Sequence, residues 1–183
     1  MAHNESKSLG GFFSVRMIAE NSIIAALYVV LTLLVPALSY DYMQCRFSEA
    51  LVLLVFWRPD LVVGLTLGCF ISNVIGASLA LNVWIDVLLG TLATFISCLL
   101  ISFFSKRLFI GWIWPVIFNG FIVGSELYFL GYLGDLPIWA GWLWVALGET
   151  IAMAIGYALW VSLAHTKVFN KAFRPLIHED VKW

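Results

Sequence analysis

Charged residues interrupt several segments of the sequence that are otherwise apolar enough to cross a membrane. They are Arg46, Glu49, Asp86, Glu126 and Glu149. An ionised side chain inside a bilayer costs about 3 kcal/mol on insertion scales unless it is paired or hydrated. Because four acids face one base, a mutually neutralising network would leave carboxylates without a partner. This surplus of acid indicates a binding site for a ligand that is positively charged or rich in hydrogen-bond donors.

Two amide side chains extend this set of candidates. Asn73 lies in the outer half of a predicted span, and Asn119 lies near the mid-depth of another. We therefore predict a polar chamber that opens toward the outer face of the membrane. A purely structural interpretation stays open, in which Arg46 pairs with Glu49 or Asp86 and the pair only orients the helices.

The elements that must position these groups follow from composition. Hydrophobic residues make up 62% of the 183 positions and charged residues 11%, which leaves too little polar surface to cover a soluble globule. The apolar runs approach the roughly 20 residues that a helix needs to cross a hydrocarbon core. We predict an all-α integral membrane protein with six transmembrane helices.

The predicted spans end at prolines and short polar stretches. They are Met17–Leu38, Glu49–Trp57, Leu61–Leu81, Trp84–Phe104, Phe109–Leu133 and Pro137–Ala164. The second is short, so it must begin between Arg46 and Ser48 to reach across. We predict a cytoplasmic leader over 1–16, a six-helix transmembrane domain over 17–166 and a cytoplasmic tail over 167–183.

Basic residues set the expected orientation, because cytoplasmic loops carry an excess of Lys and Arg. With the N-terminus inside, Arg46 is the one basic residue of ten that faces outside. The other nine are Lys7, Arg16, Arg58, Lys106, Arg107, Lys167, Lys171, Arg174 and Lys182. Both termini are therefore expected in the cytoplasm.

Several function classes have no support in the sequence. No GxxxxGK[ST], GxGxxG or Ser/His/Asp pattern is present, so the chain is expected to be no enzyme and to bind no ATP itself. The net charge of −1 comes without a basic stripe, which excludes nucleic acid as a partner. Neither a metal site nor a disulfide is expected of the widely spaced Cys and His residues. These are Cys45, Cys69, Cys98, His3, His165 and His178.

Small residues spaced four apart let helix backbones approach in lipid. We expect the glycine pairs Gly64/Gly68 and Gly120/Gly124, and the ladder Gly148/Ala152/Gly156, to pack within the chain. Ser22, Ala25 and Ala26 on the first span are candidates for contact with a partner protein.

Three segments carry a family resemblance. They are Gln44–Leu51 (QCRFSEAL), Gly64–Asn73 (GLTLGCFISN) and Asp86–Thr94 (DVLLGTLAT). The sequence resembles the QueT family over roughly Ile23 to Trp160. That family comprises substrate-binding S components of energy-coupling factor (ECF) transporters, which are associated with uptake of queuosine precursors.

The resemblance implies a multi-pass protein of the bacterial cytoplasmic membrane that binds its substrate on the outer side. It also implies a transmembrane T component and two ATPases as partners, which agrees with the missing ATP-binding motif. S components commonly dock through an Ala-x-x-x-Ala face on the first helix. Here Ala25 and Ala26 precede Val29 and Val30 by four, and only Ser22/Ala26 keeps the small-residue spacing.

The implied substrate is a 7-deazaguanine, expected in its aminomethyl form, while queuine and the other small precursor stay open. Such a base presents adjacent N–H donors and a carbonyl acceptor, and the aminomethyl group adds a cation. Carboxylates and amides complement such a ligand, and aromatic rings could stack on it. The predicted binding set is Glu49, Asp86, Glu126, Asn73, Arg46, Glu149 and Asn119. Arg46 would contact the substrate carbonyl or orient Glu49. The stacking candidates are Tyr128, Trp84 and Trp142.

Other functions remain as alternatives. The chain could be an S component for another vitamin-like molecule. It could also be a stand-alone proton-coupled carrier in which Glu126 and Glu149 relay protons, although no inverted repeat is visible. An intramembrane enzyme lacks a recognisable nucleophile and base.

Overall fold

The computed structural model describes residues 14–41 and 43–173, and within these ranges every regular element is helical. Expectations for the leader before residue 14 and for the tail beyond residue 173 lie outside the described residues. The elements are α1 (Val15–Leu34), α2 (Pro36–Ser39), η2 (Phe47–Phe56), η3 (Pro59–Leu61), α3 (Val62–Ser78), α4 (Asp86–Phe104), α5 (Leu108–Phe129), α6 (Ile138–Ala164) and α7 (Lys167–Phe173).

Five stretches within the described residues are long and apolar enough to span a membrane: α1, Pro59–Ser78, α4, α5 and α6. They coincide with five of the predicted spans, and their ends differ by a few residues. The first helix ends at Leu34 because Val35 precedes a proline and adopts an extended φ of −133°. Helix α5 ends at Phe129, and the turn after it uses Gly131 and Gly134 at positive φ.

The second predicted span takes a different form from the expected transmembrane α-helix. It begins at Phe47, inside the expected window, but it is the ten-residue 3-10 helix η2. At about 2.0 Å per residue, such a helix covers roughly 20 Å, less than the thickness of a hydrocarbon core. Every residue from Ser48 to Phe56 is buried. Protein rather than lipid therefore surrounds this segment.

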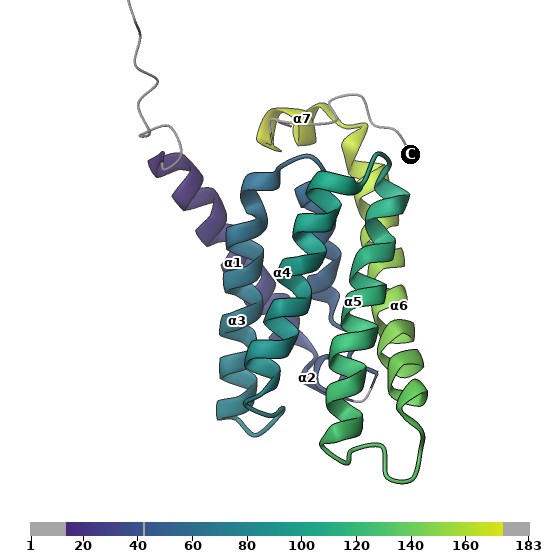
Figure 1. Ribbon diagram of the computed structural model, residues 1–183. Coiled ribbons are helices and arrows are strands. Elements are labelled where there is room, and N and C mark those ends of the chain that lie inside the picture. The colour runs from purple at the N-terminus through teal and green to yellow at the C-terminus, as the bar shows by residue number, and fades with distance from the viewer. Residues whose placement is uncertain (1–13, 42, 174–183) are drawn as a thin grey trace, which may run out of the picture.

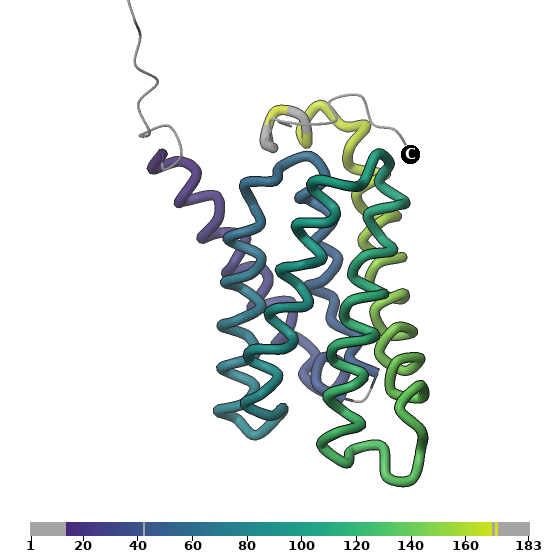
Figure 2. The backbone as a smooth tube through the Cα atoms, in the orientation of Figure 1, coloured from purple at the N-terminus to yellow at the C-terminus, as the bar shows by residue number. Residues whose placement is uncertain are grey.

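The chain runs back and forth along the bundle, with η2 behind α4 and α5 (Figures 1 and 2). The start of α1 and α7 lie at one end, called here the α7 end. The connections α3–α4 and α5–α6 lie with α2 at the other, called the α2 end. The first half of α1 leans away from the bundle. Accordingly, 22% of the apolar stretch of α1 is buried inside the protein, against 56% of the apolar stretch of Pro59–Ser78.

Glycines bring the helices close together, as the sequence predicted. A Cβ on Gly156 would lie 2.8 Å from Ala50 Cα, so α6 packs directly on η2. A Cβ on Gly124 would lie 2.8 Å from the Gly141 backbone, which brings α5 against α6. Gly68 of α3 likewise lets α1 pack directly against α3. The interpretation of these positions as internal packing is confirmed.

Candidate functional site

A buried ion pair joins Arg46, just before η2, to Asp86, the first residue of α4. Arg46 Nη2 lies 2.8 Å from Asp86 Oδ2, and the two residues are 4% and 1% exposed. Arg46 also donates to the Gln44 amide oxygen at 2.9 Å and to the Ser39 carbonyl at 3.1 Å. Burial alone would lower the pKa of Arg46, but Asp86 together with neighbouring acidic groups, Glu49 among them, outweighs burial and raises that pKa. The guanidinium therefore stays charged.

Two further groups complete the ion pair. Asn82 donates its amide N–H to Asp86 Oδ2 at 2.8 Å. The Arg46 guanidinium lies 5.6 Å from the centre of the Tyr40 ring, within range of a cation–π interaction. The Tyr40 hydroxyl donates to the Ser72 carbonyl at 2.7 Å, and burial raises its pKa to about 12. Tyr40 thus stays neutral and ties α3 to the segment after α2.

The two oxygens of Asp86 differ in their surroundings. Oδ2 accepts from both Arg46 and Asn82, whereas buried Oδ1 has no hydrogen-bond partner among the described residues. Asn73 donates to the Asp86 backbone carbonyl at 3.1 Å, and its own amide oxygen is likewise unpaired in the described part of the chain. Gly90 makes room for this arrangement, because a Cβ there would lie 2.6 Å from Oδ1.

Glu49 shows the same asymmetry. Its Oε1 accepts hydrogen bonds from the Tyr28 hydroxyl of α1 and, at 3.0 Å, from the Thr94 hydroxyl of α4. Its Oε2 is buried and finds no hydrogen-bond donor among the described residues. Arg46 therefore pairs with Asp86, while Tyr28 and Thr94 hold Glu49.

A deeper polar pair lies between α5 and α6. Glu149 is 2% exposed and lies within electrostatic reach of Glu49 and beside Asn119. One carboxyl oxygen of Glu149 and the Asn119 amide nitrogen both lack a well-formed hydrogen bond within the described ranges. An acceptor and a donor are thus buried near each other without full hydrogen bonding, which is costly.

A cavity of about 300 Å³ lies at the α2 end. Its volume is at the small end of the range for small-molecule sites. Its polar lining includes Tyr40, Gln44, Asn82, Asp86, Glu126 and Tyr132. The structure therefore brings two predicted acids, Asp86 and Glu126, to one cavity. The buried Oε2 of Glu126 is unpaired within the described residues.

The other predicted residues do not line this cavity. Arg46, Asn73, Glu49, Glu149 and Asn119 are buried in the protein interior. The three stacking candidates do not line the cavity either. Trp84 is 63% exposed, Tyr128 is also exposed, and Trp142 donates to the Ser125 hydroxyl at 2.8 Å.

Sequence reasoning did not select Tyr28, Thr94 or Gln44. Their signal was weak, because a single Tyr or Thr in an apolar helix is usually packed or interfacial. The structure places the rings of Tyr40 and Tyr132 at the cavity instead of the predicted aromatics.

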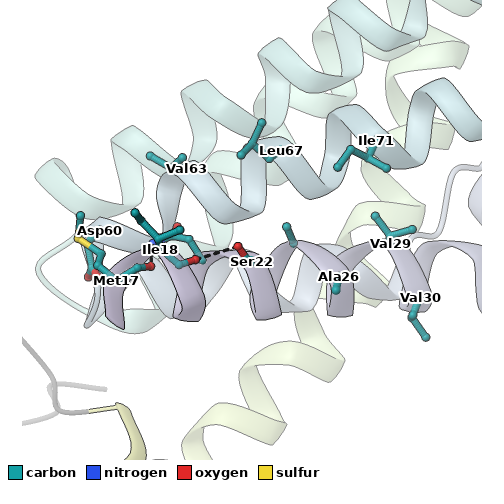
Figure 3. Close-up of a pocket in the computed structure, with 12 residues that line it drawn as sticks. Met17, Ile18, Ser22, Ala26, Val29, Val30, Asp60, Val63, Leu67 and Ile71 are labelled. Carbon is teal, nitrogen blue, oxygen red and sulfur yellow. Dashed lines mark hydrogen bonds between the residues drawn. The ribbon is translucent and has the colours of Figure 1, made fainter. Parts of the chain in front are cut away.

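The predicted docking residues border a second cavity, the α1–α3 groove of about 590 Å³ (Figure 3). Ser22 and Ala26 are exposed on it. Ala25 also borders the groove, but it is 8% exposed because its backbone packs against Gly68 of α3. Val63 and Leu67 form the opposite wall.

Comparison with known proteins decides the family. The family model described as QueT transporter matches residues 18–165. The chain belongs to the QueT transporter family. It is 29% identical over 147 residues to the queuosine precursor transporter QueT of Lactococcus lactis subsp. cremoris, strain MG1363, which covers 74% of this chain and 84% of that protein. No solved structure matches the chain. Together with its apolar helices, the QueT match identifies a multi-pass transport protein of the cell membrane.

The Arg46–Asp86 pair of this QueT family member can be tested by unfolding. Arg46→Gln leaves Asp86 buried without its cation, so we expect the free energy of unfolding to fall by about 3–5 kcal/mol. Arg46→Gln combined with Asp86→Asn removes both charges and should recover most of that loss. The measurement is chemical denaturation in mixed micelles.

Arg16→Gln is the matched control, because the Arg16–Glu20 pair is half exposed. It should cost less than about 1 kcal/mol. A double variant as unstable as Arg46→Gln alone would contradict the account of the buried pair.

Proposed function

We propose that this chain is the substrate-binding S component of an ECF-type importer that captures a queuosine precursor, a 7-deazaguanine in its aminomethyl form, from outside the cell. The observation that supports the proposal is a set of buried polar atoms without partners among the described residues. Among the predicted site residues and Asn82, most of these atoms are acceptors: Asp86 Oδ1, Glu126 Oε2, Glu49 Oε2, Glu149 Oε1, Asn73 Oδ1 and Asn82 Oδ1. The Asn119 amide nitrogen is a donor.

This set complements the proposed substrate. A guanine-like base presents ring and exocyclic N–H donors beside one carbonyl, so carboxylate oxygens can accept from the donors and Asn119 can donate to the carbonyl. The aminomethyl group adds a cation, for which Asp86 and Glu126 at the cavity are suitably placed. The relative from Lactococcus lactis is named as a queuosine precursor transporter, which supports the same substrate class.

Arg46 has a supporting role in this proposal. Its guanidinium already donates to Gln44, Ser39 and Asp86. These bonds hold Asp86 Oδ2 and leave Oδ1 as the oxygen that can accept from the substrate. We therefore assign Arg46 to orienting Asp86 and not to reading the substrate carbonyl.

Substrate binding can be measured on the detergent-purified chain with a panel of deazaguanines, guanine and B vitamins. We expect aminomethyl-deazaguanine to raise the unfolding temperature most. In calorimetry, Glu126→Gln and Glu49→Gln should each raise the Kd about tenfold or more, because a charge-assisted hydrogen bond is lost.

Glu20→Gln is the control, since Glu20 pairs with Arg58 at the other end of the bundle. It should leave the Kd unchanged. Failure of the wild-type protein to bind any deazaguanine would remove the substrate assignment. Tighter binding of a B vitamin would favour an S component for another small molecule.

We further propose that the chain crosses the membrane six times, with the segment that contains η2 as the second crossing and both termini in the cytoplasm. Nine of the ten basic residues then lie inside, and the α2-end cavity opens outward. The back-and-forth path of the chain in Figure 1 supports this topology.

Cysteine labelling tests the topology. Asp135 follows α5 at the α2 end and Lys106 precedes α5 at the α7 end, and both are exposed. A membrane-impermeant maleimide should label Asp135→Cys on intact cells and Lys106→Cys only after permeabilisation. The wild-type chain, whose three cysteines are buried, serves as the blank. The reverse pattern would contradict the proposed orientation.

ATP hydrolysis is assigned to partners, a T component and two ATPases, and this chain needs no cofactor of its own. The α1–α3 groove is the proposed docking surface, because it is large, mostly apolar and bordered by the small residues Ser22 and Ala26. Small residues allow a partner helix to approach closely in lipid.

Filling the groove tests this docking. Ala26→Leu should reduce co-purification of the T component and ATP-driven uptake about tenfold, while binding of aminomethyl-deazaguanine to the isolated chain stays unchanged. Ala158→Leu, at an exposed position of α6, is the matched control and should have no effect. Uptake into liposomes that hold only this chain, driven by a pH gradient, would instead support the stand-alone carrier.

A further inference from the structure

Helix α1 has two sides with different surroundings. One side borders the α1–α3 groove with Ala26 and Val29. The other side carries Tyr28, which is fully buried. The Tyr28 hydroxyl reaches η2 and donates to Glu49 Oε1. A single helix thus connects an open groove to a buried carboxylate of the proposed substrate site.

The two hydrogen bonds to Glu49 fix its orientation. Tyr28 from α1 and Thr94 from α4 both donate to Oε1, so Oε2 is left as the oxygen without a partner in the described part of the chain. Thr94 Oγ1 also lies 3.4 Å from Cys69 Sγ of α3, which holds Thr94 in place. If the Tyr28 bond broke, the carboxyl could rotate about its remaining bond, and Oε2 would no longer point in one direction.

The position of Tyr28 depends in turn on how α1 lies against α3. A Cβ on Gly68 would lie 2.7 Å from Tyr28 Cβ and 2.9 Å from the Ala25 carbonyl, so α1 rests directly on this glycine. One turn further along, the Thr32 and Ser48 hydroxyls lie 2.7 Å apart and form a second contact between α1 and η2. This second contact does not involve a carboxylate.

We infer that Tyr28 is a positioning residue that couples the placement of α1 to substrate affinity by holding Glu49 with Oε2 toward the substrate. This inference rests on the proposed function. A displacement of α1 breaks the Tyr28–Glu49 bond and weakens substrate binding. By thermodynamic reciprocity, bound substrate stabilises α1 in its place against α3 and η2.

Tyr28→Phe tests the inference, because it removes the hydroxyl and keeps the ring in its buried place. In calorimetry with aminomethyl-deazaguanine, we expect the Kd to rise about tenfold. Thr32→Val removes a hydroxyl from the neighbouring α1–η2 contact and should leave the Kd unchanged. A general loss of packing would affect the Kd of both variants. A rise in Kd for Tyr28→Phe alone therefore indicates a specific role of the Tyr28 hydroxyl.

A double-mutant cycle shows whether the hydroxyl acts through Glu49. In the presence of Glu49→Gln, Tyr28→Phe should cause less than a twofold further rise in Kd, since its target is already altered. Additive effects of the two substitutions would overturn the inference, and so would a Tyr28→Phe protein that binds like the wild type. A wild-type protein that binds no deazaguanine would instead overturn the proposed function.

Gly68→Ala tests the coupling without altering Glu49 or Tyr28 themselves. The added methyl group pushes α1 outward at Tyr28, so the Kd should rise several-fold in the wild-type background and stay unchanged in the Tyr28→Phe background. Gly111→Ala, where the nearest neighbours of a Cβ would be Ile101 and Leu53 and not α1, is the control and should leave the Kd unchanged. Equal effects of Gly68→Ala in both backgrounds would show that α1 does not act through Tyr28.

Discussion

The enclosure of η2 is the constraint on which the rest of the structure depends. A bilayer offers no hydrogen bonds to exposed backbone groups, so a short 3-10 segment persists at membrane depth only where protein surrounds it. The long helices provide that surrounding, and the glycines of α6 allow the closest approach. Because Arg46 and Glu49 lie at the start of η2, the same enclosure carries a cation and an acid into the interior.

The buried acids are held in a half-satisfied state. In Asp86 and in Glu49, one oxygen accepts two hydrogen bonds and the other accepts none from the described residues. Such an unpaired oxygen costs free energy unless a donor reaches it. A ligand that brought donors to these oxygens would remove this cost, and the free energy recovered would contribute to its binding. This arrangement favours a site that is oriented before the ligand arrives.

Much of the fold could be predicted, because long apolar runs and prolines such as Pro36 determine where helices cross and end. The acids Asp86 and Glu126, which line one cavity, could be selected from the sequence as candidates, since their charge is costly in an apolar span. The 3-10 form of η2 was not, because a buried apolar segment has no periodic pattern that separates it from an α-helix. The Tyr28–Glu49 contact joins residues on different elements and depends on how closely α1 packs against Gly68 of α3. No local sequence pattern predicts such a contact.

The shallow attachment of α1 has a consequence for the lipid environment. The α1–α3 groove is lined mostly by aliphatic side chains, and in a bilayer that lacks a protein partner acyl chains fill such a space. Any protein that binds there must first displace those chains. Its affinity then depends on the length and saturation of the surrounding lipids as well as on its own surface. Lipid acyl chains thereby compete with a partner protein for this surface, and the lipid composition of the membrane determines how strongly they compete.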